Sequence, residues 1–471
     1  MPILNWIGKE AVVNHDKEVP FRLLKKVKSA SVGENSQNLI IHGDNLEGLK
    51  AIMPYYVGKI KCIYIDPPYN TGNEKWVYND KVNSPKIKKW LGKVVGGEAE
   101  DLCRHDKWLC MMYPRLKLLS DLLSEDGVIF VSIDDKELSN LKYLLDEIFS
   151  EKNVDVMIWK KSGEGRYGKM KNVTTFRKDH EYVLVAFKNV QRFNKIKEIP
   201  SFKNVYGNPD KDPRGEYKAG SISKKESASN EKSPNFYTVV SPSGKRFTRQ
   251  FEITKEEFER LNKDILINPD GKKVSRIYWG KNQDSVPSIK IFVNEIREIT
   301  PYSVLSTKGS TYDGKRELKE IFDIDENMEE LFPNPKPSLL VKTLVQLASD
   351  KDSIVLDSFA GSGTTGHAVL DLNKEDGGNR KFILIEMEDE IAKNITAERV
   401  KRAIKKYDYK DGFEYCELDK PLFNKDGQID EECSFEQLAT YIYFTETQTN
   451  IDKKQISKNF IGEYGDSKYY L

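Results

Sequence analysis

The stretch DPPYN at residues 66–70 combines groups that could bind an aromatic amino group. The carboxylate of Asp66 can accept one N–H bond. The carbonyl of Pro67 can accept a second one, because Pro67 and Pro68 restrict the backbone on either side of it. Tyr69 offers an aromatic face for a base, a contact that contributes roughly 1 to 3 kcal/mol in single-strand binders. An amino group conjugated with its ring is a poor nucleophile, so we expect this stretch to hold such a group for reaction.

A second stretch, DSFAGSGTT at residues 357–365, has the pattern of a turn whose backbone approaches a ligand. Its glycines with the G-x-G-x-x-G spacing are Gly361, Gly363 and Gly366. A helix follows them, and Glu386 ends the next strand, where a carboxylate can accept hydrogen bonds from ribose hydroxyls. The residue after the last glycine is His367, and no Lys-Ser/Thr pair follows. The stretch is therefore not a phosphate-binding P-loop. A nucleoside-type cofactor, a nicotinamide dinucleotide and a plain tight turn all remain open.

The sequence around these stretches predicts the strands and helices that must position them. Apolar runs and the helical spacing of apolar residues mark these elements. The expected strands are 38–44, 59–66, 127–135 and 180–187, and the expected helices are 45–56, 113–127 and 135–149. Asp134 and Asp135 can cap the last of these helices. Such a βαβα order predicts a parallel sheet with helices on both faces.

Residues 189–330 differ in character, since they are rich in Gly, Pro, Ser and Lys, and they predict a β-rich or mixed α/β insert. Between Lys160 and Lys232 there are 18 basic and 9 acidic residues. This excess favours phosphate binding, with a solvated charged surface as the alternative. After the insert the expected elements are helix 337–349, strand 353–357, helix 365–373 and strand 381–386. We therefore predict an α/β fold with a doubly wound, mostly parallel sheet.

The overall composition excludes some classes of protein. The chain has 471 residues, of which 38% are hydrophobic and 32% charged, and no apolar run has the roughly 18 to 20 residues of a membrane span. The start lacks a signal-peptide pattern, so we expect a cytoplasmic protein and no membrane partner. Lys+Arg of 75 and Asp+Glu of 74 nearly balance. The cysteines form no C-x-x-C pair, so we expect reduced thiols and no metal; they are Cys62, Cys103, Cys110, Cys416 and Cys433.

The two stretches together resemble the DNA amino-methyltransferases that use S-adenosylmethionine. DPPYN precedes DSFAGSGTT, and a catalytic half that precedes the cofactor half is the mark of the beta group. The run GKVVGGEAEDLCRHDKWLCMMYPRLKLL, followed by GVIFVSIDD, further resembles the modification subunits of type III restriction-modification systems. The resemblance covers roughly residues 38–190 and 333–400.

The resemblance implies a Rossmann-like methyltransferase fold and methyl transfer to N6 of an adenine flipped out of duplex DNA. Asp66, Pro67, Pro68 and Tyr69 would form the target-base site. The residues implied for S-adenosylmethionine are Asp44, Lys336, Asp357, Phe359, Gly361, Gly363, Thr364 and Glu386. For Lys336, which stands at a helix start in NPKPSLL, a merely structural role is the alternative. His180 begins a strand whose aromatic residues would pack near the base, with a structural role again as the alternative.

The resemblance also implies a division of the chain into four parts. These are a catalytic half at 1–188, a target-recognition insert at 189–330, a cofactor-binding half at 331–410 and a C-terminal segment at 411–471 without an assigned role. Double-stranded DNA is the expected partner. The chain is shorter than the type III subunits usually are, which leaves open a homodimer and a separate restriction subunit with endonuclease and helicase activity.

Three alternatives to adenine methylation remain at this point. Asp66 favours adenine, because similar enzymes with Ser at that position methylate the cytosine amino group at N4. A nicotinamide-dependent dehydrogenase would use the glycine turn but would leave DPPYN without a role. A DNA-binding subunit without catalysis, or one fused to a nuclease, is the third, and the residues in nuclease order are Pro209, Asp210, Glu216 and Lys218.

Overall fold

The structure is a computed structural model of the chain. It describes residues 4–34, 36–70, 100–161, 178–189, 193–198, 207–293, 295, 297–306, 308–324, 332–424, 426–430, 433–452, 454 and 456–471. The chain forms two compact units. The first unit consists of Met1–Asn194 and Pro301–Leu471, and the second consists of Lys195–Thr300.

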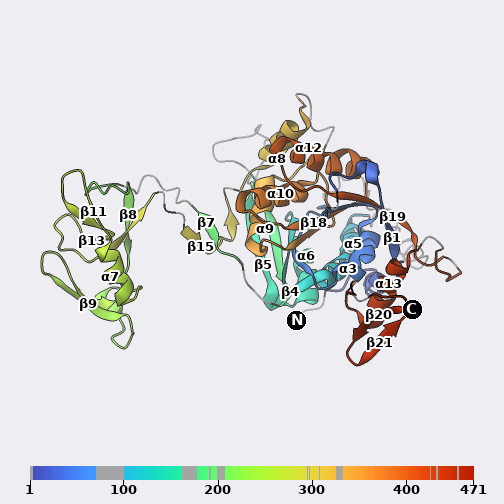
Figure 1. The fold of residues 1–471 in the computed structure, drawn as a ribbon, viewed down its shortest axis with the longest axis horizontal. Coiled ribbons are helices and arrows are strands. Elements are labelled where there is room, and N and C mark those ends of the chain that lie inside the picture. The colour runs from blue at the N-terminus through green and yellow to red at the C-terminus, as the bar shows by residue number, and fades with distance from the viewer. Residues whose placement is uncertain are drawn as a thin grey trace. The chain divides into compact units, whose positions relative to one another are not determined.

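A ten-stranded sheet forms the centre of the first unit (Figure 1), with the order β1-β19-β2-β18-β17-β3-β4-β6-β5-β16. Its strands are β1 Arg22–Lys26, β2 Leu39–His42, β3 Ile60–Ile65, β4 Leu123–Ile133, β5 Val154–Lys160, β6 His180–Phe187, β16 Val304–Leu305, β17 Ile354–Asp357, β18 Lys381–Glu386 and β19 Glu414–Pro421. The six strands from β19 to β4 are parallel, whereas β1 and β6 run antiparallel to their neighbours. The predicted doubly wound, mostly parallel α/β sheet is confirmed.

Two groups of helices pack on the sheet (Figure 1). The first group is α3 Asn45–Tyr56, α5 Glu100–Leu122 and α6 Leu138–Phe149, and the second is α8 Thr311–Phe322, α9 Ser338–Ala348, α10 Thr364–Asp376 and α12 Glu398–Tyr407. The connection from β3 to β4 and the connection from β17 to β18 run in opposite directions across the sheet. Because such crossovers are right-handed, the two groups of helices lie on opposite faces. Shorter helices are α1 Lys9–Val12, α2 His15–Glu18, α11 Asp389–Ile391, the 3-10 turns η1 Lys28–Ala30 and η2 Glu151–Asn153, and the π-helix η5 Ala392–Ala397.

Two details of the first half differ from the prediction. The helix expected over 113–127 is the second half of α5, which begins at Glu100 and ends at Leu122. β4 begins at once because Leu123 pairs with Ile60 of β3. The expected cap of α6 by Asp134 and Asp135 is wrong. The N-cap residue is Glu137, whose side chain makes no capping bond to the helix backbone. Asp134 accepts from the backbone N–H of Lys136 at 2.9 Å.

The second unit is mostly β, as the composition of the insert predicts. Its elements are β7 Ile196–Glu198, β8 Tyr217–Ser221, η4 Glu226–Ala228, β9 Phe236–Val240, β10 Arg246–Gln250, α7 Lys255–Lys263, β11 Ile265–Ile267, β12 Lys273–Ser275, β13 Ile277–Tyr278, β14 Ser288–Phe292 and β15 Arg297–Ile299. Phe247, Phe251, Phe258 and Trp279 are central to its own core. The insert was expected at 189–330, but residues 301–324 lie in the first unit, because β16 pairs with β5 and α8 packs on α12.

A buried ion cluster in the second unit contains the Asp210 of the nuclease alternative. The ammonium of Lys290 lies 2.5 Å from Asp210 Oδ2 and 2.7 Å from Asp212 Oδ2. The hydroxyl of Tyr217 donates to Asp210 Oδ1 at 2.8 Å. Lys290 therefore neutralises the charge of Asp210, and the hydroxyl of Tyr217 holds its carboxylate. These contacts link the loop at 210–212 to β14 and β8.

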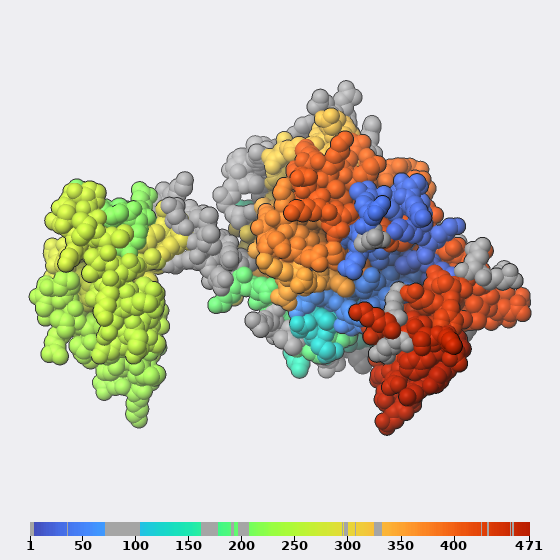
Figure 2. All heavy atoms as spheres, viewed as in Figure 1, coloured from blue at the N-terminus to red at the C-terminus, as the bar shows by residue number. Residues whose placement is uncertain are grey.

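The residues after 410 complete the first unit. β19 pairs with β2 and β1, so it is part of the central sheet. The helix α13 Phe435–Thr447 and the hairpin of β20 Phe460–Tyr464 and β21 Ser467–Tyr470 follow it. Figure 2 shows these C-terminal residues, in red, against the blue N-terminal segment. The ring centroids of Phe21 and Tyr441 lie 5.0 Å apart.

Three features of the described residues bear on the classes of protein expected from the sequence. None of the helices in the described ranges combines the length and apolar character that a bilayer crossing requires. Among the same residues, no group of three or more His, Cys, Asp or Glu side chains could hold a metal ion. The described cysteines Cys62, Cys110, Cys416 and Cys433 are free thiols.

Candidate active site

Four neighbouring parallel strands bring the candidate residues to one edge of the sheet. Asp66 directly follows β3, Asp357 ends β17 and Glu386 ends β18. Asp44 is the second residue after β2, with Gly43 between them. The order of these strands is β2-β18-β17-β3. Since the carboxyl ends of parallel strands share an edge, the stretches DPPYN and DSFAGSGTT lie side by side.

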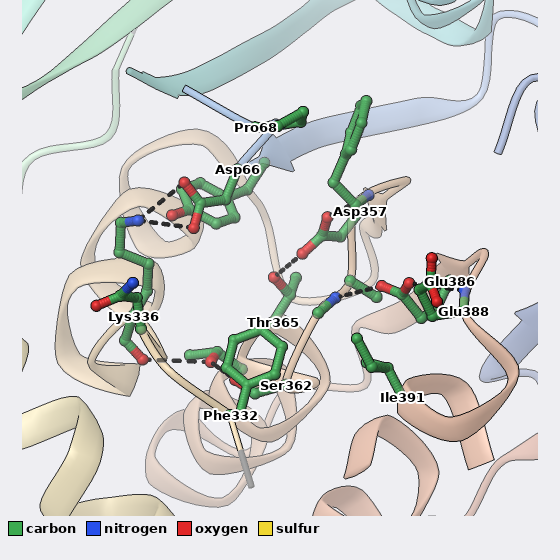
Figure 3. Close-up of a pocket in the computed structure, with 16 residues that line it drawn as sticks. Asp66, Pro68, Phe332, Lys336, Asp357, Ser362, Thr365, Glu386, Glu388 and Ile391 are labelled. Atoms are coloured by element: carbon green, nitrogen blue, oxygen red, sulfur yellow. Dashed lines mark hydrogen bonds and ion pairs between the residues drawn. The ribbon is translucent and has the colours of Figure 1, made fainter. Parts of the chain in front are cut away.

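A cavity of about 220 Å³ lies at this edge. Figure 3 shows Asp66 and Lys336 at one end of it and Glu386 at the other. The predicted site residues that line it are Asp66, Pro68, Lys336, Asp357, Phe359, Gly361, Thr364 and Glu386. The predicted residues outside its lining are Asp44, Pro67, Tyr69 and Gly363. Its further lining includes Tyr64, Phe332, Asn334, Ala360, Ser362, Thr365, Glu388 and Ile391.

Gly361 is the glycine that faces the cavity. Its φ is +50°, and a Cβ there would lie 3.1 Å from Cζ of Phe332. Its N–H donates to Glu386 Oε2 at 2.7 Å, and its carbonyl accepts from the hydroxyl of Thr396 at 2.6 Å. The missing side chain therefore leaves room between the turn and an aromatic ring.

Gly363 serves packing instead, although the resemblance assigns it to the cofactor. It is the N-cap residue of α10 with a φ of +74°, and a Cβ there would lie 2.8 Å from the carbonyl oxygen of Thr396. A Cβ at Gly366 would lie 3.1 Å from side-chain atoms of Leu384 and Val400. These two glycines let α10 approach η5 and the sheet closely, and protein atoms already fill the space beside them.

Asp357 anchors the glycine turn. Its Oδ1 accepts from the N–H of Phe359 at 3.0 Å, and its Oδ2 accepts from the hydroxyl of Thr365 at 2.5 Å. Burial raises the pKa of Asp357 to about 7, and its hydrogen bonds to Thr365 and Phe359 act in the opposite direction. This carboxyl group therefore ties the end of β17 to the first turn of α10.

Glu386 has one acceptor position left for a ligand. Its Oε1 accepts from the N–H groups of Met387 and Glu388 at 2.9 and 3.1 Å, and its Oε2 accepts from Gly361. A carboxylate has about four acceptor positions. Burial raises the pKa of Glu386, while these three backbone bonds lower it in part. The fourth position is left for a hydrogen-bond donor such as a hydroxyl.

The double-proline corner is anchored on α5 by a residue without a predicted role. The indole N–H of Trp108 donates to the carbonyl of Pro68 at 2.7 Å. Asn70 has a φ of +57°, in the left-handed region, and its side-chain amide donates to the buried carboxylate of Glu137. Trp108 lies in the stretch that resembles type III subunits. A buried indole N–H needs a hydrogen-bond acceptor, and this requirement could have pointed to a structural role for Trp108 in the sequence.

The ammonium of Lys336 binds the carboxylate of Asp66, whereas the resemblance places this lysine near the cofactor. The distances from Nζ to Oδ1 and Oδ2 are 2.8 and 2.7 Å. A second carboxylate, that of Glu181, lies 3.8 Å from the same Nζ, and the ring centroid of Tyr69 lies 4.9 Å from it. Burial lowers the pKa of Lys336, but Asp66 and Glu181 outweigh this effect and raise it above its usual value. The lysine is therefore a cation that lies beside Asp66 and Tyr69 and also lines the cavity.

Strand alternation selects Glu181 over its neighbour His180. The ring nitrogens of His180 lie 3.1 Å from Asp179 Oδ1 and 3.2 Å from the hydroxyl of Tyr182. Glu181, one residue later, accepts from the hydroxyl of Tyr69 at 3.2 Å. Successive side chains of a strand point to opposite faces, so only one of the two could face DPPYN.

Asp44 caps a helix. Its Oδ1 accepts from the N–H groups of Leu46 and Glu47 at 2.9 and 3.0 Å, and Arg115 Nη2 lies 3.6 Å from its Oδ2. The structure therefore places this residue at the N-terminus of α3 and outside the cavity lining. Asp directly before a helix is a common capping signal, which the sequence already contains.

Thr364 is tied to a buried arginine that has no predicted role. Arg399 of α12 donates to Thr364 Oγ1 at 2.7 Å and to Ser362 Oγ at 3.0 Å. The hydroxyl of Thr364 donates in turn to the carbonyl of Lys336 at 3.2 Å. Burial lowers the pKa of Arg399 to about 10. This chain of bonds links the glycine turn to the segment that carries Lys336.

Comparisons with known proteins place the chain in a family. The DNA methylase family matches residues 60–398. The Mod subunit of the type III enzyme StyLTI from Salmonella typhimurium is 32% identical over 379 residues, which are 78% of this chain and 55% of that protein. The Mod subunit of EcoPI from Escherichia phage P1 is 32% identical over 438 residues, which are 84% and 65%.

A type II methyltransferase, M.KpnI from Klebsiella pneumoniae, is 30% identical over 386 residues, which are 79% of this chain and 85% of that protein. The chain spans about half to two thirds of the length of the Mod subunits that it matches. The family match covers well over half of the chain and contains both stretches of the candidate site. The chain belongs to the DNA methylase family.

Proposed function

We propose that this chain transfers a methyl group from S-adenosylmethionine to N6 of an adenine flipped out of duplex DNA, as the modification component of a restriction-modification system. The observation that carries the proposal is that Asp66 and Glu386 lie at the two ends of one cavity, with the glycine turn between them. Membership of the DNA methylase family and the similarity to Mod subunits support it.

The cavity has the polarity that S-adenosylmethionine requires. Glu386 retains one acceptor position for a ribose hydroxyl, and Phe332 and Ile391 are apolar lining residues. We assign Phe359, Gly361, Thr364 and Glu386 to direct binding of the cofactor. Three residues have indirect roles in this assignment. Asp44 caps α3, Gly363 lets α10 pack closely, and Asp357 anchors the glycine turn. The bound cofactor supplies a methyl group on a sulfonium, whose C–S bond breaks with the electron pair left on sulfur.

Asp66 and the carbonyl of Pro67 accept the two N–H groups of the target amine in this proposal. The nitrogen lone pair forms the new N–C bond, positive charge develops on the nitrogen, and the carboxylate of Asp66 stabilises that charge. The nitrogen then releases one proton to solvent. The base must leave the stack to reach the site, and Tyr69 provides a stacking face. Alignment of the reacting atoms at about 3 to 3.5 Å contributes most of the rate.

The second unit is the proposed contact for DNA. It contains a hollow of about 600 Å³. Its charged lining residues are Lys211, Lys272, Lys273, Lys281, Asp210 and Asp270, and Tyr278 is its partly exposed aromatic residue. Lysines bind phosphates and aromatic rings stack on bases, so this lining suits a nucleic acid. A restriction subunit is a further proposed partner, on the basis of the Mod subunits alone, and a homodimer is the alternative assembly.

Mass spectrometry of nucleosides tests the proposed reaction. The purified chain is incubated with S-adenosylmethionine and genomic DNA from a host without adenine methylation, and the DNA is digested to nucleosides. We expect N6-methyladenine, and sequencing of the modified DNA then identifies the recognition sequence. N4-methylcytosine as the product would favour the cytosine alternative, and the absence of any methylated base with retained cofactor binding would favour a silent DNA-binding subunit.

A further inference from the structure

Lys336 occupies the carboxylate that the target amine needs. Its ammonium nitrogen lies within 2.8 Å of both carboxylate oxygens of Asp66 and donates hydrogen bonds to them. The side chain of Lys336 is 9% exposed and that of Asp66 is 25% exposed, so the pair is largely shielded from water. An incoming amino group is also a hydrogen-bond donor. Both donors draw on the same two oxygens, and the ammonium already takes two of their roughly four acceptor positions.

Glu181 is a second carboxylate within reach of the same ammonium. Its Oε2 lies 3.8 Å from Lys336 Nζ, about one ångström beyond hydrogen-bond distance. The side chain of Glu181 is only 12% exposed, and Lys161 binds its Oε1 at 3.2 Å. Glu181 is the second residue of β6 and pairs with Trp159 of β5, so the sheet restrains its backbone.

Movement between the two carboxylates requires only the side chain of Lys336. Its backbone carbonyl accepts from Thr364, and Pro337 follows it directly, so the backbone is restrained. The four-carbon stem of a lysine has several rotatable bonds. Tyr69 connects the two ends of this movement, since its ring lies under the ammonium and its hydroxyl donates to Glu181.

We propose that Glu181 is a positioning residue that takes the Lys336 ammonium from Asp66 when the target amino group binds. The inference rests on the proposed function. Asp66 then changes from one half of an ion pair to a free acceptor, and the cation moves away from the nitrogen that becomes positive. In the protein without DNA, the ammonium is paired with Asp66.

The variant Glu181→Gln tests this inference by equilibrium binding of labelled duplexes in the presence of S-adenosylhomocysteine. One duplex carries adenine at the target position, and a matched duplex carries 2-aminopurine, which has no amino group at position 6. We expect the variant to bind the adenine duplex roughly ten- to hundredfold more weakly, the effect of losing one hydrogen bond to a charged group. We expect unchanged binding of the 2-aminopurine duplex and of S-adenosylhomocysteine alone. Equal weakening for both duplexes would overturn the inference.

A double-variant cycle separates this role from a structural one. In Lys336→Met no ammonium has to leave Asp66, so adding Glu181→Gln should cause little further loss of adenine-duplex binding. A residue that merely supports Tyr69 would cause the same loss in both backgrounds, and that result would overturn the inference. Lys161→Met, which removes only the partner of the other Glu181 oxygen, is the matched control. Glu181→Asp, whose shorter side chain cannot reach Nζ, repeats the test if the Gln variant does not fold.

The outcomes also distinguish this inference from the proposed function. If the unaltered chain does not methylate adenine, the proposed function fails. If it methylates adenine and Glu181→Gln binds the adenine duplex as well as the unaltered chain does, only the exchange between Asp66 and Glu181 fails.

Discussion

Asp66 is the residue on which the proposed chemistry depends most. In Asp66→Ala the target amine loses its charged acceptor, so we expect kcat to fall roughly 100- to 1000-fold, the usual cost of losing one preorganised group at a developing charge. The affinity for S-adenosylhomocysteine should stay within about twofold by calorimetry, because the cofactor is bound by the other end of the cavity. Lys336 keeps Glu181 as a neighbouring carboxylate in this variant. Near-normal turnover would show that Asp66 does not hold the amine.

Asp357 should make folding stability depend on pH. Its pKa is raised from 3.8 to about 7 in the folded chain, so between about pH 4 and 7 the folded state retains a proton that the unfolded state has released. Its contribution to the free energy of unfolding is therefore fully present below pH 4 and is lost as pH rises through 7. In Asp357→Asn the amide can still accept from Phe359 and contact Thr365, but this titration is absent.

Urea unfolding at pH 5 and pH 7.5 measures that difference. We expect the stability of Asp357→Asn relative to the unaltered chain to increase from pH 5 to pH 7.5. Glu386, whose pKa is also raised, is present in both proteins and cancels in the comparison. The same pH dependence in both proteins would mean that Asp357 is ionised throughout this range.

At the scale of elements, the two glycines of the turn before α10 have different roles: Gly363 serves packing, and Gly361 faces the proposed cofactor. Gly363→Ala places a Cβ 2.8 Å from the carbonyl oxygen of Thr396 at a φ of +74°. We expect a loss of at least about 1 to 2 kcal/mol in the free energy of unfolding, the usual cost of a left-handed conformation for a residue with a Cβ. Gly361→Ala, with its Cβ directed at Phe332, should chiefly weaken S-adenosylhomocysteine binding.

Unfolding curves and calorimetry on the two glycine variants provide the comparison. Both positions have positive φ, so each variant controls for the backbone strain of the other. A Gly363→Ala protein of unchanged stability that no longer binds S-adenosylhomocysteine would mean that the cofactor occupies the space beside Gly363.

Element positions could be predicted where local sequence and tertiary structure agree. The helix expected at 45–56 is α3 with the same ends, because Asp44 caps it and its apolar spacing is regular. The end of α5 could not be predicted, since the helical spacing continues past Leu122 while pairing with β3 draws Leu123 into β4. The contacts of Lys336 and Glu181 with DPPYN also escaped prediction, because each depends on a side-chain direction that only the assembled sheet determines.

At the scale of the whole molecule, the order of strands explains why two distant stretches form one site. Parallel strands with crossovers predict ligand residues at carboxyl ends, so the shared edge could be predicted from the sequence. The contribution of β19 could not, because GFEYCELDK has no partner that local sequence identifies. In the structure this strand covers the edge of β2.

Removal of the second unit should separate cofactor binding from DNA binding. We expect a chain in which a flexible Gly-Ser linker replaces Lys195–Thr300 to fold and to bind S-adenosylhomocysteine, because the cavity is built by the first unit alone. Its affinity for duplex DNA should fall at least tenfold, a loss of about 1.4 kcal/mol. Gel-shift titration and calorimetry measure the two affinities. Unchanged DNA affinity would move the main DNA contact to the first unit.

A crystal structure of the chain with S-adenosylhomocysteine tests most directly whether the two stretches form one active site. We predict that the ligand lies in the cavity of Figure 3, with its ribose hydroxyls bonded to Glu386 and its sulfur directed towards Asp66. A ligand bound outside this cavity, or one whose sulfur points away from Asp66, would contradict the central claim.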